Sequence, residues 1–278
     1  MSNERALAAA RSMLFVPGDR PDRFPKAASS GADLIVLDLE DAVAPAQKAS
    51  ARAEIDAWLA SGRSAVVRIN GFETSWYDED VALVAPHGCP VMLPKAHDRD
   101  QISQLAGQLP AGSGVIALVE TAAGVLAAGA ISTHPAVARV AFGSVDLAAE
   151  LDVDPEDWKP MLFARSALVM ALASAGAPAP IDGVTTVLDV AALRRATAAA
   201  ARLGFAGKLC IHPDQVSTVN RAFAPSAADV ARARRIVGAA EGTGVTMLDG
   251  QMVDKPVVQR ARRLLAKADG FALRQAGT

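Results

Sequence analysis

Short apolar runs recur along the whole chain, and helix-like stretches separate them. The runs are continuous rather than alternating, which is the pattern of parallel strands that are covered on both faces. Eight such runs that alternate with helices predict a (β/α)8 TIM barrel rather than an open sheet. The predicted strands are Ser12–Pro17, Leu34–Leu39, Ala65–Ile69, Pro90–Pro94, Val115–Val119, Arg139–Phe142, Ala179–Gly183 and Lys208–Ile211.

Helix-starting and helix-ending residues mark several of the intervening stretches. Pro45 suits a first helical turn, and the helix that follows it should end at Gly62. Asp189 is a candidate N-cap for a later helix, and Gly204 is its expected stop. These signals support helices between the predicted strands.

The chain continues for two more helical stretches after the last predicted strand. Ser226 is a candidate N-cap, with Asp229 three residues further on, and the sequence GTGVTMLDGQ separates the two stretches. We therefore expect a TIM-barrel catalytic domain over residues 1–225 and a C-terminal helical extension, acting as a lid, over residues 226–278.

Composition excludes several classes of protein. Of the 278 residues 51% are hydrophobic, so a large core is expected, and the net charge of −2 gives no electrostatic case for nucleic acid. The two cysteines, Cys89 and Cys210, are expected to be free thiols in a reducing compartment. We find no apolar run long enough for a membrane span and no secretory leader, and we expect a cytoplasmic protein. No dinucleotide or P-loop fingerprint follows the first strand.

Polar side chains follow each predicted strand. Because the active sites of TIM barrels lie at the C-terminal ends of the strands, these residues are expected to form a ring at one mouth of the barrel. They are Asp19 and Arg20, then Asp38, Glu40 and Asp41, then Arg68 and Asn70, and finally Lys95, Glu120, Asp146, Asp182 and His212.

Taken singly, several of these residues have a structural explanation. Asp41 would serve equally well as a helix cap, Lys95 as an exposed loop charge, and His212, before Pro213, as a turn residue. Polar residues follow all eight predicted strands, and this coincidence favours a functional site over separate structural explanations.

Glu120 and Asp146 are the metal candidates, because two carboxylates at the ends of successive strands can share one Mg²⁺. The alternative for Glu120 is a buried pair with a lysine or an arginine. Arg68 lies between Val67 and Ile69, and its guanidinium suits a substrate carboxylate.

A set of ordered motifs carries a family resemblance from about Arg11 to Leu265. The chain resembles the citrate lyase β-subunit-like (CitE-like) group of the HpcH/HpaI aldolase and citrate lyase superfamily. The motifs are RSMLFVPGDRPDRFPKA, ADLIVLDLEDAVAP, RIN, VMLPK, LVETAAGV, FGSVDLAAEL, PIDGV, GFAGKLCIHPDQV and LDGQMVDKPVV.

The resemblance implies a Mg²⁺-dependent barrel enzyme that makes or breaks a carbon–carbon bond in a 3-hydroxyacyl-CoA thioester such as malyl-CoA or citramalyl-CoA. The products of cleavage would be acetyl-CoA and a 2-oxo acid. By this resemblance Glu120 and Asp146 hold the metal, and Arg68 grips the keto-acid carboxylate. Arg20 and Lys26 resemble the residues that meet the CoA phosphates.

Further roles follow from the same resemblance. Glu40 and Asp41 resemble acids near the metal and its waters, and we group Lys95 with them as substrate-binding. Asp254 resembles a catalytic acid/base in a C-terminal lid, although Asp before Lys-Pro is also a good helix start. A lid that reaches a neighbouring subunit implies a homo-oligomer, a trimer or a hexamer.

Two departures refine the comparison. Many relatives have Glu where this chain has Val145, so one acid is absent. The pyruvate-aldolase branch typically has His where this chain has Asp41, which favours the thioester branch.

Three alternatives stay open: a thioesterase on the same scaffold, a citrate lyase β-subunit acting on a citryl-acyl carrier protein, and a catalytically silent binding barrel. The sequence does not distinguish glyoxylate, pyruvate and oxaloacetate as the 2-oxo acid.

Overall fold

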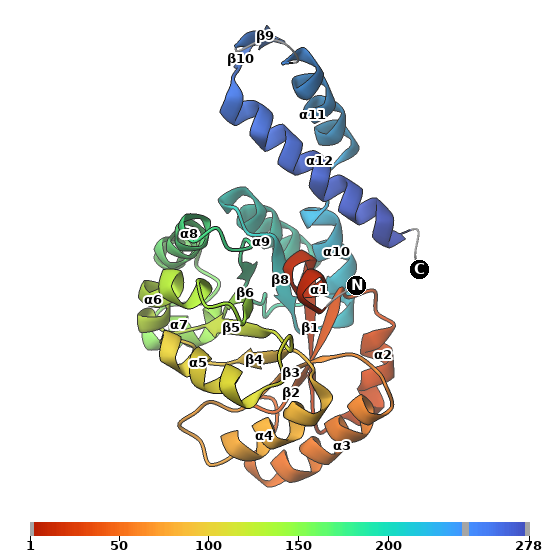
Figure 1. Ribbon diagram of the computed structural model, residues 1–278, viewed down its shortest axis with the longest axis vertical. Coiled ribbons are helices and arrows are strands. Elements are labelled where there is room, and N and C mark those ends of the chain that lie inside the picture. Colours follow the sequence, from red (N-terminus) through yellow and green to blue (C-terminus); the bar gives the residue numbers. More distant parts are fainter. Residues whose placement is uncertain (1–2, 241–244, 276–278) are drawn as a thin grey trace. The chain divides into compact units, whose positions relative to one another are not determined.

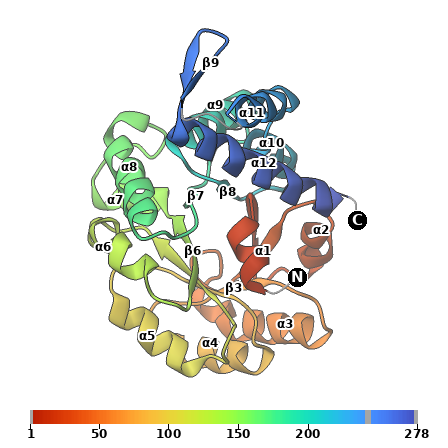
Figure 2. The ribbon, with the colours of Figure 1, turned by 45° about the horizontal axis from the view of Figure 1, so that its top comes forward.

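The computed structural model describes residues 3–240 and 245–275, and it divides into two compact units, Met1–Asn220 and Arg221–Thr278. The first unit is a closed barrel of parallel strands in the order β1 to β8. Figures 1 and 2 show its strands enclosed by its helices. The predicted TIM barrel is confirmed.

All eight predicted strands are present, with ends that differ by at most two residues. The strands are β1 (Ser12–Pro17), β2 (Leu34–Asp38), β3 (Val66–Arg68), β4 (Val91–Leu93), β5 (Val115–Val119), β6 (Val137–Phe142), β7 (Ile181–Asp182) and β8 (Gly207–Cys210).

The helices of the barrel unit alternate with the strands, except that one helix precedes β1 and two helices stand between β6 and β7. They are α1 (Asn3–Ala9), α2 (Phe24–Ala28), α3 (Lys48–Ala60), α4 (Tyr77–Val84), α5 (Arg99–Gln108), α6 (Ala122–Ser132), α7 (Ser144–Glu150), α8 (Trp158–Ser174), α9 (Val190–Leu203) and α10 (Pro213–Phe223). Short 3-10 turns cover Pro21–Arg23, Pro45–Gln47 and Ala85–His87.

The caps of α9 form as the sequence predicts. The Asp189 carboxylate accepts a hydrogen bond from the Ala192 amide, 2.6 Å away, and Gly204 ends the helix with a φ of 111°. Only glycine adopts such a φ without strain, so the stop is set locally. Pro45 differs slightly from the expectation, because it opens a 3-10 turn that leads into α3.

The barrel interior is apolar, and α1 covers its N-terminal end. Val36, Val66 and Leu118 belong to the central cluster, which Leu7 and Ala10 of the α1 segment join. Side chains alternate along a strand, so a step of two residues from these three positions leads to Asp38, Arg68 and Glu120 on the same inward side. Three charged groups are thereby aimed at the C-terminal mouth.

The second unit contains α11 (Ala227–Ala239), β9 (Thr246–Leu248), β10 (Gln251–Val253) and α12 (Lys255–Gln275), and α11 packs against α12. Ser226 caps α11 by accepting from the Asp229 amide at 3.1 Å, as predicted. Gly242 and Gly244 of the expected break lie outside the described residues.

The rest of the expected break is an ordered hairpin. Its two-residue turn, Asp249–Gly250, has φ values of 51° and 75°, and Asp-Gly is well suited to such a turn between antiparallel strands. Within the described part of the chain, no helix is long and apolar enough to cross a membrane.

Candidate active site

A pocket of about 340 Å³ opens at the C-terminal mouth of the barrel. Apolar side chains form much of its wall, and carboxylates enter from three sides. Its lining comprises Phe15, Asp38, Asp41, Ala42, Arg68, Leu118, Glu120, Phe142, Gly143, Ser144, Val145, Asp146, Val184, Leu209 and Ile211.

Arg68 is held in the pocket by two carboxylates. Its Nε and Nη2 donate to the two oxygens of Asp38 at 2.7 and 2.6 Å, and its Nη1 lies 2.8 Å from Glu40 Oε2. The guanidinium also lies over the Phe15 ring, 4.8 Å from its centroid. Two of its five N–H donors are hydrogen-bonded to Asp38, and the contact with Glu40 is an ion pair, so N–H donors are left for a ligand.

Asp38 organises this corner of the pocket, although from the sequence it had only a place in the expected ring and no specific role. Besides holding Arg68, its oxygens accept from the amides of Glu40 at 2.9 Å and Ala42 at 3.2 Å. It is 1% exposed. The signal was present in the sequence: an aspartate one strand over from an arginine, both on the inward side.

Lys95 connects two acids of the site. Its Nζ lies 3.0 Å from Glu40 Oε1, and its amide donates to Glu120 Oε1 at 2.8 Å. Its φ of 50° is in the left-handed region, which is uncommon for a residue with a side chain. This backbone conformation accompanies an amide turned toward Glu120, an arrangement typical of functional sites.

Glu120 is almost fully buried, with 2% of its surface exposed. Burial, together with the nearby charges of Glu40 and Asp146, raises the pKa of Glu120 to about 8. Gly143 makes room for it, because a Cβ at that position would lie 2.3 Å from the Glu120 Cβ. The hydrogen bond that Glu120 accepts comes from the Lys95 amide and not from a lysine or arginine side chain, which does not match the alternative of a simple buried ion pair.

Asp146 completes this side of the site. It lies in the first turn of α7, directly after β6, and it is partly buried in the pocket wall. The structure therefore brings Glu120, Asp146, Arg68 and Asp41 to one pocket, and Glu40, beside it, contacts Arg68 and Lys95. No group of three His, Cys, Asp or Glu side chains that would form a metal cage occurs in residues 3–240 or 245–275.

Asp182 does not belong to the mouth of the barrel, and its predicted place in the ring is wrong. It is completely buried and pairs with Arg165 Nε at 3.0 Å and with Lys208 Nζ at 2.7 Å. Because Ile181 faces the barrel core, its neighbour Asp182 points to the opposite side, toward α8. The two cations lower the pKa of Asp182 against the effect of burial.

His212 and Asn70 have structural contacts that explain them. The His212 Nδ1 accepts from the Asp214 amide at 3.2 Å, which is the turn role considered above. Asn70 is 2% exposed, and its Nδ2 donates a hydrogen bond to the Leu39 carbonyl oxygen at 2.9 Å.

Arg20 and Lys26 lie on the surface after β1. Arg20 donates from Nε and Nη2 to the carboxylate of Asp22, both at 3.1 Å, and this contact raises the pKa of Arg20. Lys26 is exposed in α2. Both side chains are accessible to a phosphate ligand, and Arg20 would exchange its contact with Asp22 for it.

Asp254 caps α12 in the second unit. Its Oδ1 accepts from the Val257 amide at 3.2 Å, three residues further on. The capping role is thus present in the structure, and the catalytic role stays a prediction.

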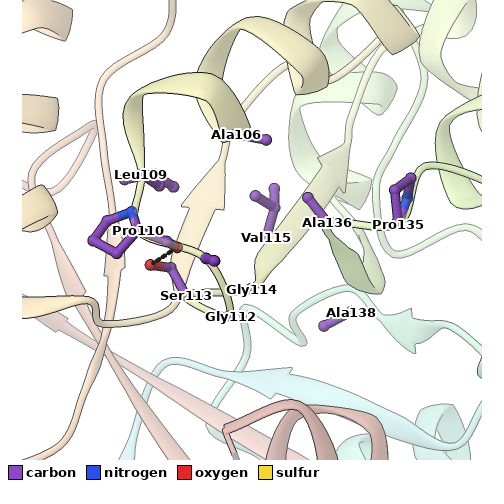
Figure 3. Close-up of a pocket in the computed structure, with 11 residues that line it drawn as sticks. Ala106, Leu109, Pro110, Gly112, Ser113, Gly114, Val115, Pro135, Ala136 and Ala138 are labelled. Carbon is purple, nitrogen blue, oxygen red and sulfur yellow. Dashed lines mark hydrogen bonds between the residues drawn. The ribbon is translucent and has the colours of Figure 1, made fainter.

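Two other hollows lack the cluster of carboxylates that lines the pocket at the barrel mouth. A pocket of about 180 Å³ lies before β5 and β6, at the N-terminal end of the barrel, and Figure 3 draws the residues that line it. Small and apolar residues line it, and the Ser113 hydroxyl is bonded to the Pro110 carbonyl at 2.8 Å. A hollow of about 800 Å³ on α9 carries Arg194, Arg195 and Arg202 on an open surface.

The geometry defines a barrel with an acidic pocket at the C-terminal mouth, and comparison with known proteins agrees. A family model described as HpcH/HpaI aldolase/citrate lyase matches residues 11–213, and one described as C-C bond lyase of the TIM-barrel fold matches residues 167–273. The chain therefore belongs to the HpcH/HpaI aldolase/citrate lyase family, as the motifs indicated.

Individual relatives match over nearly their whole length. A citrate lyase subunit beta-like protein of Mycobacterium tuberculosis (strain CDC 1551 / Oshkosh) is 38% identical over 94% of this chain and 96% of its own. A (3S)-malyl-CoA thioesterase of Cereibacter sphaeroides (strain ATCC 17025 / ATH 2.4.3) is 34% identical over 94% and 95%. The crystal structure of CitE from Mycobacterium tuberculosis in complex with magnesium, acetoacetate and coenzyme A superposes with a TM-score of 0.81 at 36% identity, covering 94% of this chain and 99% of that one.

Proposed function

We propose that this chain is a Mg²⁺-dependent carbon–carbon lyase that cleaves a 3-hydroxyacyl-CoA thioester, such as malyl-CoA or citramalyl-CoA, to acetyl-CoA and a 2-oxo acid. The family consists of aldolases and citrate lyases. The observation that carries the finer proposal is the excess of carboxylates in a pocket that also holds an arginine suited to a substrate carboxylate.

The charge of the site supports a divalent cation. Five carboxylates lie at or beside the pocket, and two of them, Asp38 and Glu40, form ion pairs with Arg68 and Lys95. An anionic substrate entering such a pocket would be repelled unless a further cation were bound. The carboxylates are Asp38, Glu40, Asp41, Glu120 and Asp146.

Glu120 and Asp146 fit the metal role. Glu120 is buried with its pKa raised to about 8, a state that a bound cation relieves, and Gly143 gives its side chain space. Mg²⁺ is typically bound by one or two carboxylates and keeps positions for water and substrate oxygens. When bound, the ion would supply Lewis-acid polarisation and a template for the substrate oxygens. The related CitE from Mycobacterium tuberculosis binds magnesium.

Arg68 would orient the substrate. Arg68 lines the pocket and keeps N–H donors that are not hydrogen-bonded to Asp38, and a guanidinium binds a planar carboxylate well. Its contacts with Asp38 and Glu40 fix the guanidinium before a ligand arrives, so little orientation is lost on binding.

The reaction also needs a proton at carbon. Cleavage takes the proton from the substrate hydroxyl, breaks the carbon–carbon bond and leaves the enolate of acetyl-CoA, which must be protonated. We assign that protonation to Asp254 on the basis of the family resemblance, with residues 226–278 as the lid of a homotrimer or hexamer. Phe15, Leu118 and Phe142 give the pocket an apolar wall that excludes water from the enolate.

Arg20 and Lys26 would meet the phosphates of CoA. They are exposed cations on the segment that follows β1, at the end of the barrel where the pocket opens. The related CitE binds coenzyme A.

A thioesterase is the second candidate, because a relative of nearly full length is a (3S)-malyl-CoA thioesterase. In that reaction water attacks the thioester carbonyl, the carbon–sulfur bond breaks, and CoA leaves as the free thiol, while the carbon–carbon bond stays intact. The same pocket would serve both reactions.

The test is a panel of synthetic acyl-CoA thioesters incubated with Mg²⁺, in which free thiol and 2-oxo acid are followed together. The lyase yields a 2-oxo acid and acetyl-CoA without free thiol. Free CoA with an intact hydroxy acid identifies the thioesterase, and the absence of both products for every thioester refutes the proposal.

A further inference from the structure

A buried polar cluster lies behind the loops that follow β2 and β3. Lys48, Asn70 and Asp80 form it, and they are 4%, 2% and 0% exposed. None of the three lines the pocket. Lysine and aspartate are costly to bury, and apolar residues of similar size are often neutral or better for stability. The cluster therefore calls for an explanation beyond packing.

Lys48 is fully occupied by the loop after β2. Its Nζ donates to the carbonyl oxygens of Leu39 at 2.6 Å and Glu40 at 2.8 Å, and to Asn70 Oδ1 at 2.9 Å. An ammonium has three donors, so each one has a partner. Two of the three partners are main-chain atoms at and next to Glu40.

Asn70 and Asp80 extend the connection to the loop after β3. Asn70 Nδ2 donates to Leu39 O at 2.9 Å and to Asp80 Oδ2 at 2.6 Å, and its amide donates to the same Asp80 oxygen at 2.8 Å. Asp80 Oδ1 accepts from Arg52 at 3.1 Å. The loop that carries Glu40 is thus tied to the residue two positions after Arg68.

We propose that Lys48 is a positioning residue for the active site: it fixes the main chain at Leu39 and Glu40 so that the Glu40 carboxylate spans Arg68 and Lys95. Glu40 Oε2 lies 2.8 Å from Arg68 Nη1 and Glu40 Oε1 lies 3.0 Å from Lys95 Nζ, and a shift of the Glu40 main chain would break both contacts. The kinetic consequences rest on the proposed lyase function, whereas the position of Glu40 does not.

The experiment compares Lys48→Met with a matched control, Arg139→Met. Arg139 is also a buried cation, 1% exposed, and it donates to the main-chain carbonyls of Leu7 and Ala8. It lies at the opposite end of the barrel, next to α1. Both variants lose hydrogen bonds to two main-chain carbonyls and should be destabilised, so both are assayed well below their melting temperatures.

Lys48→Met should lower kcat/KM on a cleaved thioester by about 10- to 100-fold, since a displacement of about 1 Å in a positioning group has effects of this size. Arg139→Met should keep the wild-type kcat/KM despite its lower melting temperature. Equal kinetic losses in the two variants, or wild-type kinetics in Lys48→Met, would overturn the proposal.

Crystal structures of the variants give a readout independent of turnover. In Lys48→Met the Glu40 carboxylate should leave Arg68, and in Arg139→Met it should stay; an unmoved Glu40 in Lys48→Met overturns the proposal even if no thioester is cleaved by the wild type. If Lys48→Met does not fold, Lys48→Arg replaces it. Arginine keeps the charge, but its donors lie in a plane on three nitrogens and cannot reach the three partners of Lys48 from one atom. A displaced Glu40 carboxylate is therefore again expected, and a Glu40 carboxylate that stays in place would overturn the proposal.

Discussion

Replacing Glu120 by glutamine is expected to stabilise the metal-free protein at alkaline pH. The pKa of Glu120 is raised from 4.5 to about 8, chiefly by burial and then by the charges of Glu40 and Asp146. Between these two values the unfolded chain has lost the proton and the folded chain keeps it. Folded stability therefore falls as the pH rises from about 4.5 to about 8, and stays reduced above that.

The size of the effect follows from the shift. A difference of one pKa unit corresponds to about 1.4 kcal/mol, so the shift from 4.5 to about 8 amounts to about 5 kcal/mol at full ionisation. Glu120 is 2% exposed, so solvent screening does not reduce this figure appreciably. Glu120→Gln removes the charge and keeps the shape. Its advantage over wild type should be near zero below pH 4.5 and grow by about 1.4 kcal/mol per pH unit up to about pH 8.

The assay is urea unfolding of both proteins in a metal chelator, at several pH values from 4.5 to 9. Mg²⁺ should then restore the wild type by mass action, by about 2.7 kcal/mol at a concentration one hundred times its Kd, and leave Glu120→Gln unchanged. Parallel pH profiles for the two proteins would refute the reasoning about burial. A full Mg²⁺ response in Glu120→Gln would remove Glu120 from the metal site.

Three further predictions address other parts of the site. Gly143→Ala places a Cβ about where the Glu120 side chain lies, so Mg²⁺ affinity measured by calorimetry should fall at least tenfold, on the order of 1.4 kcal/mol, and unchanged affinity would contradict the need for space. Asp254→Asn should keep the α12 cap and the melting temperature but lose about 10²-fold in kcat if Asp254 is the acid/base; near-normal turnover would leave only the cap. Changing Arg20 and Lys26 together to Ala should raise KM for the CoA thioester by about 3- to 10-fold with little effect on 2-oxo acid affinity, and an unchanged KM would exclude them from CoA binding.

The residues at strand ends that were correctly predicted to reach the pocket are those whose inward direction could be inferred from the alternation of the strand. Asp38, Arg68 and Glu120 each follow an inward core residue by two positions, and the alternation of a strand carries them to the pocket. Asp182 ends a strand of two residues, too short to show a pattern, and it faces the helix layer instead. A position at the end of a strand therefore predicts a place in the pocket only when the alternation along the strand shows that the side chain points inward.

The amino-acid sequence by itself determined the barrel, its strands, the caps of α9 and α11, and the family, because these depend on local periodicity, local hydrogen bonds and ordered motifs. Only the tertiary structure decided which charges meet. The hydrogen bond from Lys48 to Asn70, the space that Gly143 leaves for Glu120 and the raised pKa of Glu120 all arise from atoms that are far apart in the chain. Burial and Coulomb interactions depend on distances in space, and no spacing in a sequence records them.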